Sequence, residues 1–220
     1  MRRYPFFILF LILSFQLSAQ VAIIQDKDGY TNVRTQPNAK SAIIYVLHDN
    51  EMFEYNTEDD TSKWVKVFIR KNKFDIHPWA EDNSLIGYIH RSRILDIGNL
   101  TMDEVLCSFK PIVKPFVAAE HIIDYDGNNA VKIDGRYPFG IDGLVPTKET
   151  VDIEVYVDGV LMPIPKVLFE NLYQSNRNPR IVNYYQTYFI TEHNSDGAGG
   201  YTVYWAVDHS GLQQRIMLLR

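Results

Sequence analysis

The chain of 220 residues contains a single cysteine, Cys107, and fewer basic than acidic side chains. One cysteine excludes an intrachain disulfide framework and a zinc site built from several thiolates. The 22 lysine and arginine residues against 27 aspartate and glutamate residues give a net charge of -5, which argues against a protein that binds nucleic acid by neutralising phosphates. Glycine and proline, at 12 and 10 residues, are too few for a collagen-like or low-complexity chain. With 46% hydrophobic residues, the chain is predicted to fold around a core.

Long apolar runs are also scarce, apart from one stretch at the start of the sequence. Two arginines precede an apolar run over 4–15, and small residues follow just before Gln20. This pattern predicts a secretory signal peptide over 1–19, cleaved near Ala19 and Gln20. The run is about half of the ~20 apolar residues that a membrane-spanning helix needs. We therefore expect a periplasmic or extracellular protein without stable membrane insertion.

The first half of the expected mature chain alternates short β-rich runs with turn residues, which is the pattern of a small all-β unit. Gly29 follows three polar residues and is expected to form a turn at positive φ, which glycine adopts without steric cost. The expected strands lie at 22–24, 43–47, 51–55, 64–68 and 86–89. Five strands this short within 80 residues favour a compact barrel.

Four segments in this region follow one another in the order of a known family's motifs. They are TNVRTQP at 31–37, VL and EMFEY within 46–55, WVKV at 64–67 and GYIHRSRI at 87–94. In this order they resemble the bacterial SH3-like (SH3b) family of small barrels, which are attached to many exported bacterial proteins. The resemblance implies an SH3-like barrel over 20–97. Gln36 and Asn50 stand where the family has glycines, and an insertion at 68–85 replaces a short turn.

The resemblance implies binding rather than catalysis, with a cell-wall peptide or an extracytoplasmic protein as the partner. Because a peptide groove uses exposed aromatic side chains and polar groups that orient the ligand, the candidate ligand-binding residues are Tyr30, Arg34, Tyr55, Trp79 and Tyr88. Trp64 is a further aromatic candidate. For Trp64 and Tyr88 the favoured alternative is a core or half-buried place, since both lie in strand motifs. Arg34 either pairs with a ligand carboxylate or braces its own loop. The insertion at 68–85 either contacts the ligand or docks the two halves of the protein, and we favour docking.

The second half of the sequence differs from the first in its residue pattern. Residues 98–150 are predicted to be a linker and loops, because Pro111 and Pro115 are expected to end regular structure and glycines are frequent after them. A short strand at 130–133 is the exception. Beyond residue 150, alternating valine and isoleucine predict a strand over 151–157.

The remaining elements complete a predicted domain over 151–220. Asp158-Gly159 is a hairpin turn into a return strand at 160–162, and a helix is expected from Pro165 to just before Asn176. The last strands are expected at 180–191, 201–207 and 212–219. The fold class is therefore mainly β: an SH3-like barrel followed by an α+β domain with an antiparallel sheet and one helix. The stretches 164–173 and 194–205 resemble a C-terminal domain of exported Bacteroidetes-type proteins, which implies no particular reaction.

Catalytic and metal-binding motifs are not found. Cys107 lies in Leu-Cys-Ser-Phe, outside the helix-start context that activates a thiolate, and Ser195 lacks the Gly-x-Ser-x-Gly elbow. The six histidines show no zinc-ligand spacing. We therefore expect neither catalytic residues, a metal site nor a cofactor, and predict an exported non-catalytic binding protein. The alternatives are an inhibitor or immunity-type protein that blocks an exported enzyme, and a hydrolase with a carboxylate pair, which leaves no sequence spacing.

Overall fold

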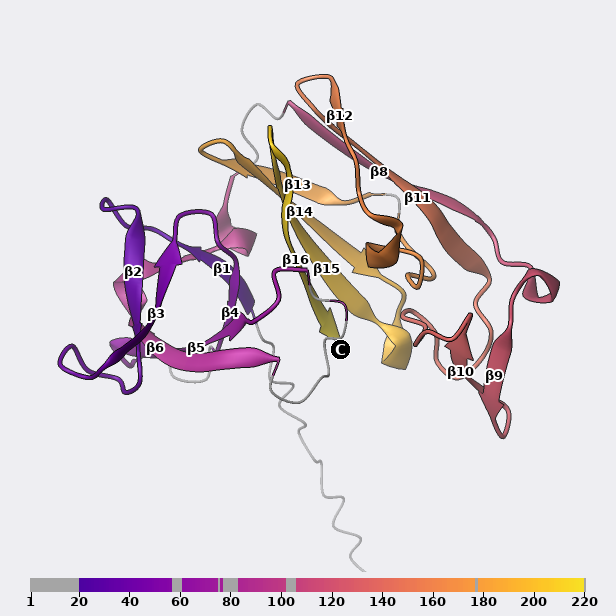
Figure 1. The fold of residues 1–220 in the computed structure, drawn as a ribbon, viewed down its shortest axis with the longest axis horizontal. Helices are drawn as coiled ribbons and strands as arrows, with labels where there is room; N and C mark the ends of the chain where they lie inside the picture. Colours follow the sequence, from indigo (N-terminus) through magenta and orange to yellow (C-terminus); the bar gives the residue numbers. More distant parts are fainter. Residues whose placement is uncertain are drawn as a thin grey trace, which may run out of the picture.

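The computed structural model describes residues 20–56, 61–74, 76, 83–101, 106–176 and 178–219. In these residues the chain is mainly β, with antiparallel sheets, short 3-10 turns and no α-helix. Figure 1 shows the strands up to residue 96 wrapped around a common centre, beside two further layers built by the later strands. No helix among the described residues is long and apolar enough to cross a membrane.

Seven antiparallel strands form the N-terminal sheet. They are β1 (Gln20–Ile24), β2 (Tyr30–Arg34), β3 (Ile43–His48), β4 (Phe53–Tyr55), β5 (Trp64–Arg70), β6 (Ser84–His90) and β7 (Ile94–Asp96), in the spatial order β3-β2-β6-β5-β4-β1-β7. Alternation decides which side chains lie inside: on β5, Val65, Val67 and Ile69 are buried while Trp64 and the residues between them face outward. The five strands expected in this region are all present, and β2 and β7 add two more.

Gly87 marks the closest approach of β6 to β2. A Cβ at this position would lie 2.4 Å from Val33 Cγ1 and 3.0 Å from the Arg34 carbonyl oxygen. A side chain there would force the two strands apart, because buried backbone cannot give way as a flexible side chain does. The glycine is therefore required by packing.

The C-terminal part consists mainly of two layers. A three-stranded sheet has the order β12-β11-β8, and a four-stranded sheet has the order β13-β14-β15-β16. The bounds are β8 Cys107–Pro115, β11 Lys148–Val157, β12 Val160–Met162, β13 Arg180–Tyr184, β14 Thr187–Asn194, β15 Tyr201–Asp208 and β16 Gly211–Leu219; β9 (Ile123–Asp126) and β10 (Asn129–Ile133) form a separate hairpin. A core cluster that includes Phe109, Val155, Leu168 and Trp205 fills the space between the two layers.

The described residues of the segment 98–150, expected to be linker and loops, contain β8, β9, β10 and the start of β11, and β10 confirms the short strand expected at 130–133. Strand β8 includes both Pro111 and Pro115 and pairs with β11 over nine residue pairs, interrupted by one register shift. The expectation that these prolines end regular structure is wrong because β8 is an edge strand. A proline that lacks an N–H donor is tolerated where one side of the strand has no neighbour.

The expectation of a helix from Pro165 to just before Asn176 is wrong. The structure has one 3-10 turn, Lys166–Leu168, and the following residues pair with other segments instead. The Tyr173 N–H donates to the Phe139 carbonyl at 2.9 Å, and the Leu172 carbonyl accepts the Thr150 N–H at 3.2 Å. The apolar spacing expected of a helix still buries Leu168 and Leu172, but tertiary backbone hydrogen bonds replace the helical ones.

The sequence predicted one strand over 180–191, but the structure has a hairpin of two strands there, β13 and β14. The chain turns at Tyr185 and Gln186, and Tyr184 pairs with Thr187. Tyr185 has φ 54°, a conformation that is uncommon for a bulky residue. No glycine marks this turn in the sequence, which is why its β-rich residues favoured one long strand.

The four-stranded sheet is the middle layer of the molecule, as Figure 1 shows. On its second face Val182, Phe189, Ala206 and Ile216 pack in one cluster with residues of the N-terminal part, among them Ile23, Met52 and Ile97. Gln214 joins the two parts directly, because its Oε1 accepts the Met52 N–H at 2.7 Å and its Nε2 donates to the Met52 carbonyl at 2.8 Å. Both faces of this sheet are therefore buried.

The insertion between β5 and β6 also contacts the C-terminal part. The Arg215 N–H donates to the Lys73 carbonyl at 2.8 Å, and Phe74 forms a parallel bridge with Arg215. Phe74 and Ile76 pack against the C-terminal core cluster. For these described residues, the insertion docks the two halves together, which is the alternative that we favoured from the sequence.

Candidate functional site

A shallow groove of about 250 Å³ lies on the outer face of the N-terminal sheet. Tyr30 and Arg34, two of the predicted binding residues, line it from β2, and Trp64 and His90 line it from β5 and β6. Strand alternation brings Tyr30 and Arg34 to the same face. Trp64 and His90 are direct partners in the β5–β6 ladder, and their rings meet edge to face with 5.7 Å between centroids.

Charges of both signs surround these aromatic rings. Asp26 and Asp28 line one part of the groove, together with Arg93. Arg93 Nη1 lies 3.0 Å from Asp26 Oδ2, and the Asp26 side chain is almost buried. The groove therefore offers apolar contact at its rings and both donors and acceptors at its rim, which suits a polar peptide rather than a purely apolar ligand.

Arg34 braces its own loop. Its Nη1 donates to the Ser41 carbonyl at 2.7 Å, and the Ser41 hydroxyl in turn donates to the Gln36 carbonyl at 2.9 Å. Of the two roles expected for Arg34, the loop-bracing role is the one that these contacts provide. A guanidinium carries five N–H donors, so this bond leaves donors that can face the groove.

The other predicted residues lie elsewhere. Tyr55 is buried in the core of the N-terminal sheet, where its hydroxyl contacts Gln20 Oε1 at 2.6 Å and Asp96 Oδ2 at 2.7 Å, so it cannot line an exposed groove. Tyr88 is half-buried on the outer face, paired with Lys66 and Arg34, next to the groove but outside its lining. Trp79 lies outside the described residues.

Trp64 was weighed from the sequence as a binding residue, with a place in the core as the favoured alternative, whereas His90, Asp26, Asp28 and Arg93 were not singled out. Trp64 was expected to be core or half-buried, and it is half-buried. The signal that identifies Trp64 and His90 is their facing position: Trp64 begins the WVKV motif, His90 ends the GYIH segment, and the two residues are partners across β5 and β6. His90 Nδ1 also accepts the Ser92 N–H at 3.3 Å, which fixes the ring orientation.

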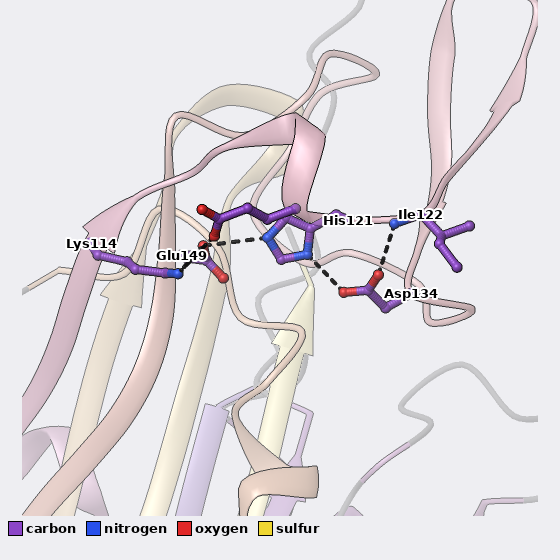
Figure 2. Close-up of polar contacts among 6 residues, drawn as sticks. Lys114, His121, Ile122, Asp134 and Glu149 are labelled. Atoms are coloured by element: carbon purple, nitrogen blue, oxygen red, sulfur yellow. Dashed lines mark hydrogen bonds and ion pairs between the residues drawn. The ribbon is translucent and has the colours of Figure 1, made fainter.

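A second polar cluster surrounds His121 in the C-terminal part (Figure 2). His121 Nδ1 lies 2.7 Å from Asp134 Oδ2, and His121 Nε2 lies 3.4 Å from Glu149 Oε1. Lys114 Nζ approaches the same Glu149 oxygen at 3.3 Å. The Phe116 ring stacks on the imidazole, with 4.5 Å between centroids and 13° between planes.

This arrangement favours the protonated form of the His121 ring. Burial lowers the pKa of the imidazole, but the hydrogen bond to Asp134 and the charge of Glu149 outweigh this effect and raise the pKa above its ordinary value. The same hydrogen bond lowers the pKa of Asp134. A protonated imidazole donates from both nitrogens and has no lone pair to accept a proton. The cluster therefore fits a structural clamp better than a general base.

The thiol of Cys107 lacks the two properties of a nucleophilic cysteine, which are exposure and a lowered pKa. Cys107 is buried, and burial raises the pKa of its thiol to about 11. A reactive cysteine needs a lowered pKa and exposure. Among the described residues, no group of three or more His, Cys, Asp or Glu side chains is arranged to hold a metal ion.

One carboxylic acid is fully buried away from both sites. Glu192 Oε2 accepts the Trp205 Nε1–H at 2.7 Å. Burial raises the pKa of Glu192 to about 7, against the opposing effects of Trp205 and the nearby Arg215. The side chain lies inside the C-terminal part and is buried to 1% exposure, so substrate cannot reach it.

The comparisons with known proteins give no family and no neighbour, because the chain matches no family model, no curated protein and no solved structure.

Proposed function

We propose that this protein is an exported, non-catalytic binding protein that holds a peptide in the groove of its N-terminal, SH3-like barrel. The observation that carries the proposal is the groove itself, in which Tyr30, Arg34, Trp64 and His90 converge from three strands. Tyr30 is 47% exposed and offers a rigid ring with a polar edge, the type of side chain that contributes most contact area at low entropic cost.

The size and charge of the groove favour a peptide with polar groups. A volume of about 250 Å³ is below the usual ~300–1,000 Å³ of a site for a whole drug-sized ligand, so it suits one or two side chains of an extended chain. Asp26, Asp28 and Arg34 provide partners for both ammonium and carboxylate groups. Cell-wall peptides carry both, and they are the ligand class that the family resemblance implies.

The experiment is co-sedimentation of residues 20–220 with purified peptidoglycan sacculi. Tyr30→Ala removes the most exposed ring of the groove and is expected to weaken saturable binding. Tyr125→Ala is the matched control, because Tyr125 is 55% exposed on the β9–β10 hairpin, away from the groove.

The outcomes separate the proposed ligand classes. Binding that Tyr30→Ala weakens and Tyr125→Ala leaves unchanged supports a wall peptide in the groove. Equal effects of both variants would contradict the groove assignment. No binding at low salt would reject the wall-peptide ligand and leave a protein partner; a stable complex with one exported enzyme would then favour the inhibitor function.

A further inference from the structure

The C-terminal part contains a second, open cavity of about 380 Å³. It lies where the ends of β8, β11 and β14 meet the segment 174–176, and the residues that line it are Val113, Lys148, Gln174, Ser175, Asn176, His193 and Ser195. Six of these seven side chains are polar or basic. The volume falls within the usual ~300–1,000 Å³ of small-molecule sites.

Two amides on the cavity wall have their oxygen atoms already engaged. Gln174 Oε1 accepts the Thr147 hydroxyl at 3.0 Å, and Asn176 Oδ1 accepts the Asn178 N–H at 3.1 Å. A backbone N–H can only donate, so the Asn176 amide is oriented without ambiguity. The NH₂ groups of both side chains therefore remain as donors.

The charge of the cavity wall agrees with this orientation. Lys148 adds an ammonium group whose nitrogen forms no ion pair with any described residue. No acidic side chain occurs among the described residues that line the cavity. Two amide NH₂ groups and an ammonium group, with no carboxylate among the described lining residues, match a group that carries several acceptor oxygens.

The backbone that positions these donors is itself unusual. Gln174 has φ 56° and Ser195 has φ 57°, and the two residues are joined by a hydrogen bond from the Ser195 N–H to the Gln174 carbonyl at 3.4 Å. The Ser195 hydroxyl donates to the Gly140 carbonyl at 2.9 Å and holds the turn in place. Left-handed non-glycine residues cost energy and are concentrated at binding sites.

From this convergence we propose that the cavity is a binding site for a small molecule bearing a carboxylate or phosphate group, held by Lys148, Gln174 and Asn176. The oxyanion accepts from the ammonium and from the two amide NH₂ groups, and the rest of the ligand occupies the space beside Val113. The site lies apart from the groove of the N-terminal sheet, so it does not depend on the function proposed for that groove.

The test is an NMR titration of ¹⁵N-labelled residues 20–220 with three probes: N-acetylglycine, its neutral analogue N-acetylglycinamide, and inorganic phosphate. We expect saturable shifts of the Gln174 and Asn176 side-chain NH₂ signals with at least one of the two anions and none with the neutral analogue. Saturation by N-acetylglycine identifies a carboxylate ligand, and saturation by phosphate alone identifies a phosphate ligand.

Variants connect these shifts to the proposed contacts. Lys148→Gln is expected to weaken binding by about tenfold, the effect of losing one hydrogen bond to a charged group. Lys110→Gln is the matched control, since Lys110 is an exposed lysine on neighbouring β8, and it is expected to leave binding unchanged. Shifts that do not saturate, that appear equally with the neutral analogue, or that are the same in Lys148→Gln would overturn the proposal.

Discussion

Gln214→Met tests whether the two halves of the molecule are one packed unit. Gln214 is buried and satisfies both backbone groups of Met52, with distances of 2.7 and 2.8 Å. Methionine is close to glutamine in size, so the main loss is of two hydrogen bonds that leave a buried N–H and a buried carbonyl unpaired. Each unpaired group costs about 1–3 kcal/mol. We expect the free energy of unfolding to fall by about 3 kcal/mol, after the gain from the added apolar surface.

The assay is urea denaturation, with thermal unfolding as a second measurement. For a domain of this size each kcal/mol moves the melting temperature by about 2–4 °C, so a decrease of roughly 10 °C is expected. Gln186→Met, in the exposed β13–β14 turn, is the control and should change little. A loss below about 0.5 kcal/mol in Gln214→Met would refute the argument, because it would mean that water already reaches Met52 and that the interface is loose.

Three further results are expected. Gly87→Ala should destabilise the fold by about 2 kcal/mol or more, measured by urea denaturation, because its Cβ would overlap Val33; an unchanged midpoint would contradict the close approach. His121 has a raised pKa in the folded state, so its contribution to stability is fully present below the unfolded pKa of about 6.5 and is lost as the pH rises through the folded value. The midpoint difference between wild type and His121→Gln should therefore shrink from pH 6 to pH 9; a constant difference would argue against the clamp. The Cys107 thiol should react with a thiol reagent at pH 8 only after denaturation, and rapid reaction of the native protein would show that it is accessible.

Several strands were predictable because one face is buried and the other is exposed. The strand expected at 64–68 is present as β5, on which Val65, Val67 and Ile69 are buried and alternate with outward-facing residues. The wrong predictions concern segments in which contacts with distant parts of the chain override a local sequence preference. Proline was expected to end β8 but lies within it at the edge of a sheet, and the helical spacing after Pro165 was satisfied by backbone bonds to Phe139 and Thr150.

The candidate site was predictable only in part. Tyr30 and Arg34 share a face because two residues on one strand alternate to the same side, and this can be read from spacing. The inward orientation of Tyr55 depends on which strands flank β4, which the sequence does not state. His121, Asp134 and Glu149 are separated by 13 and 15 residues along the chain and meet only through folding, so no motif could have identified their cluster.

A sheet that is covered on both faces cannot belong to one half of the molecule alone. Separating the chain near residue 100 would expose Phe189 and Ile216 on one fragment and Ile23 and Met52 on the other, and each fragment would carry an apolar face prone to association. The shared layer thus predicts that the two parts unfold together as one cooperative unit. It also holds the Tyr30 groove and the Lys148 cavity in a fixed relative orientation, because the parts that carry them pack against opposite faces of the same sheet.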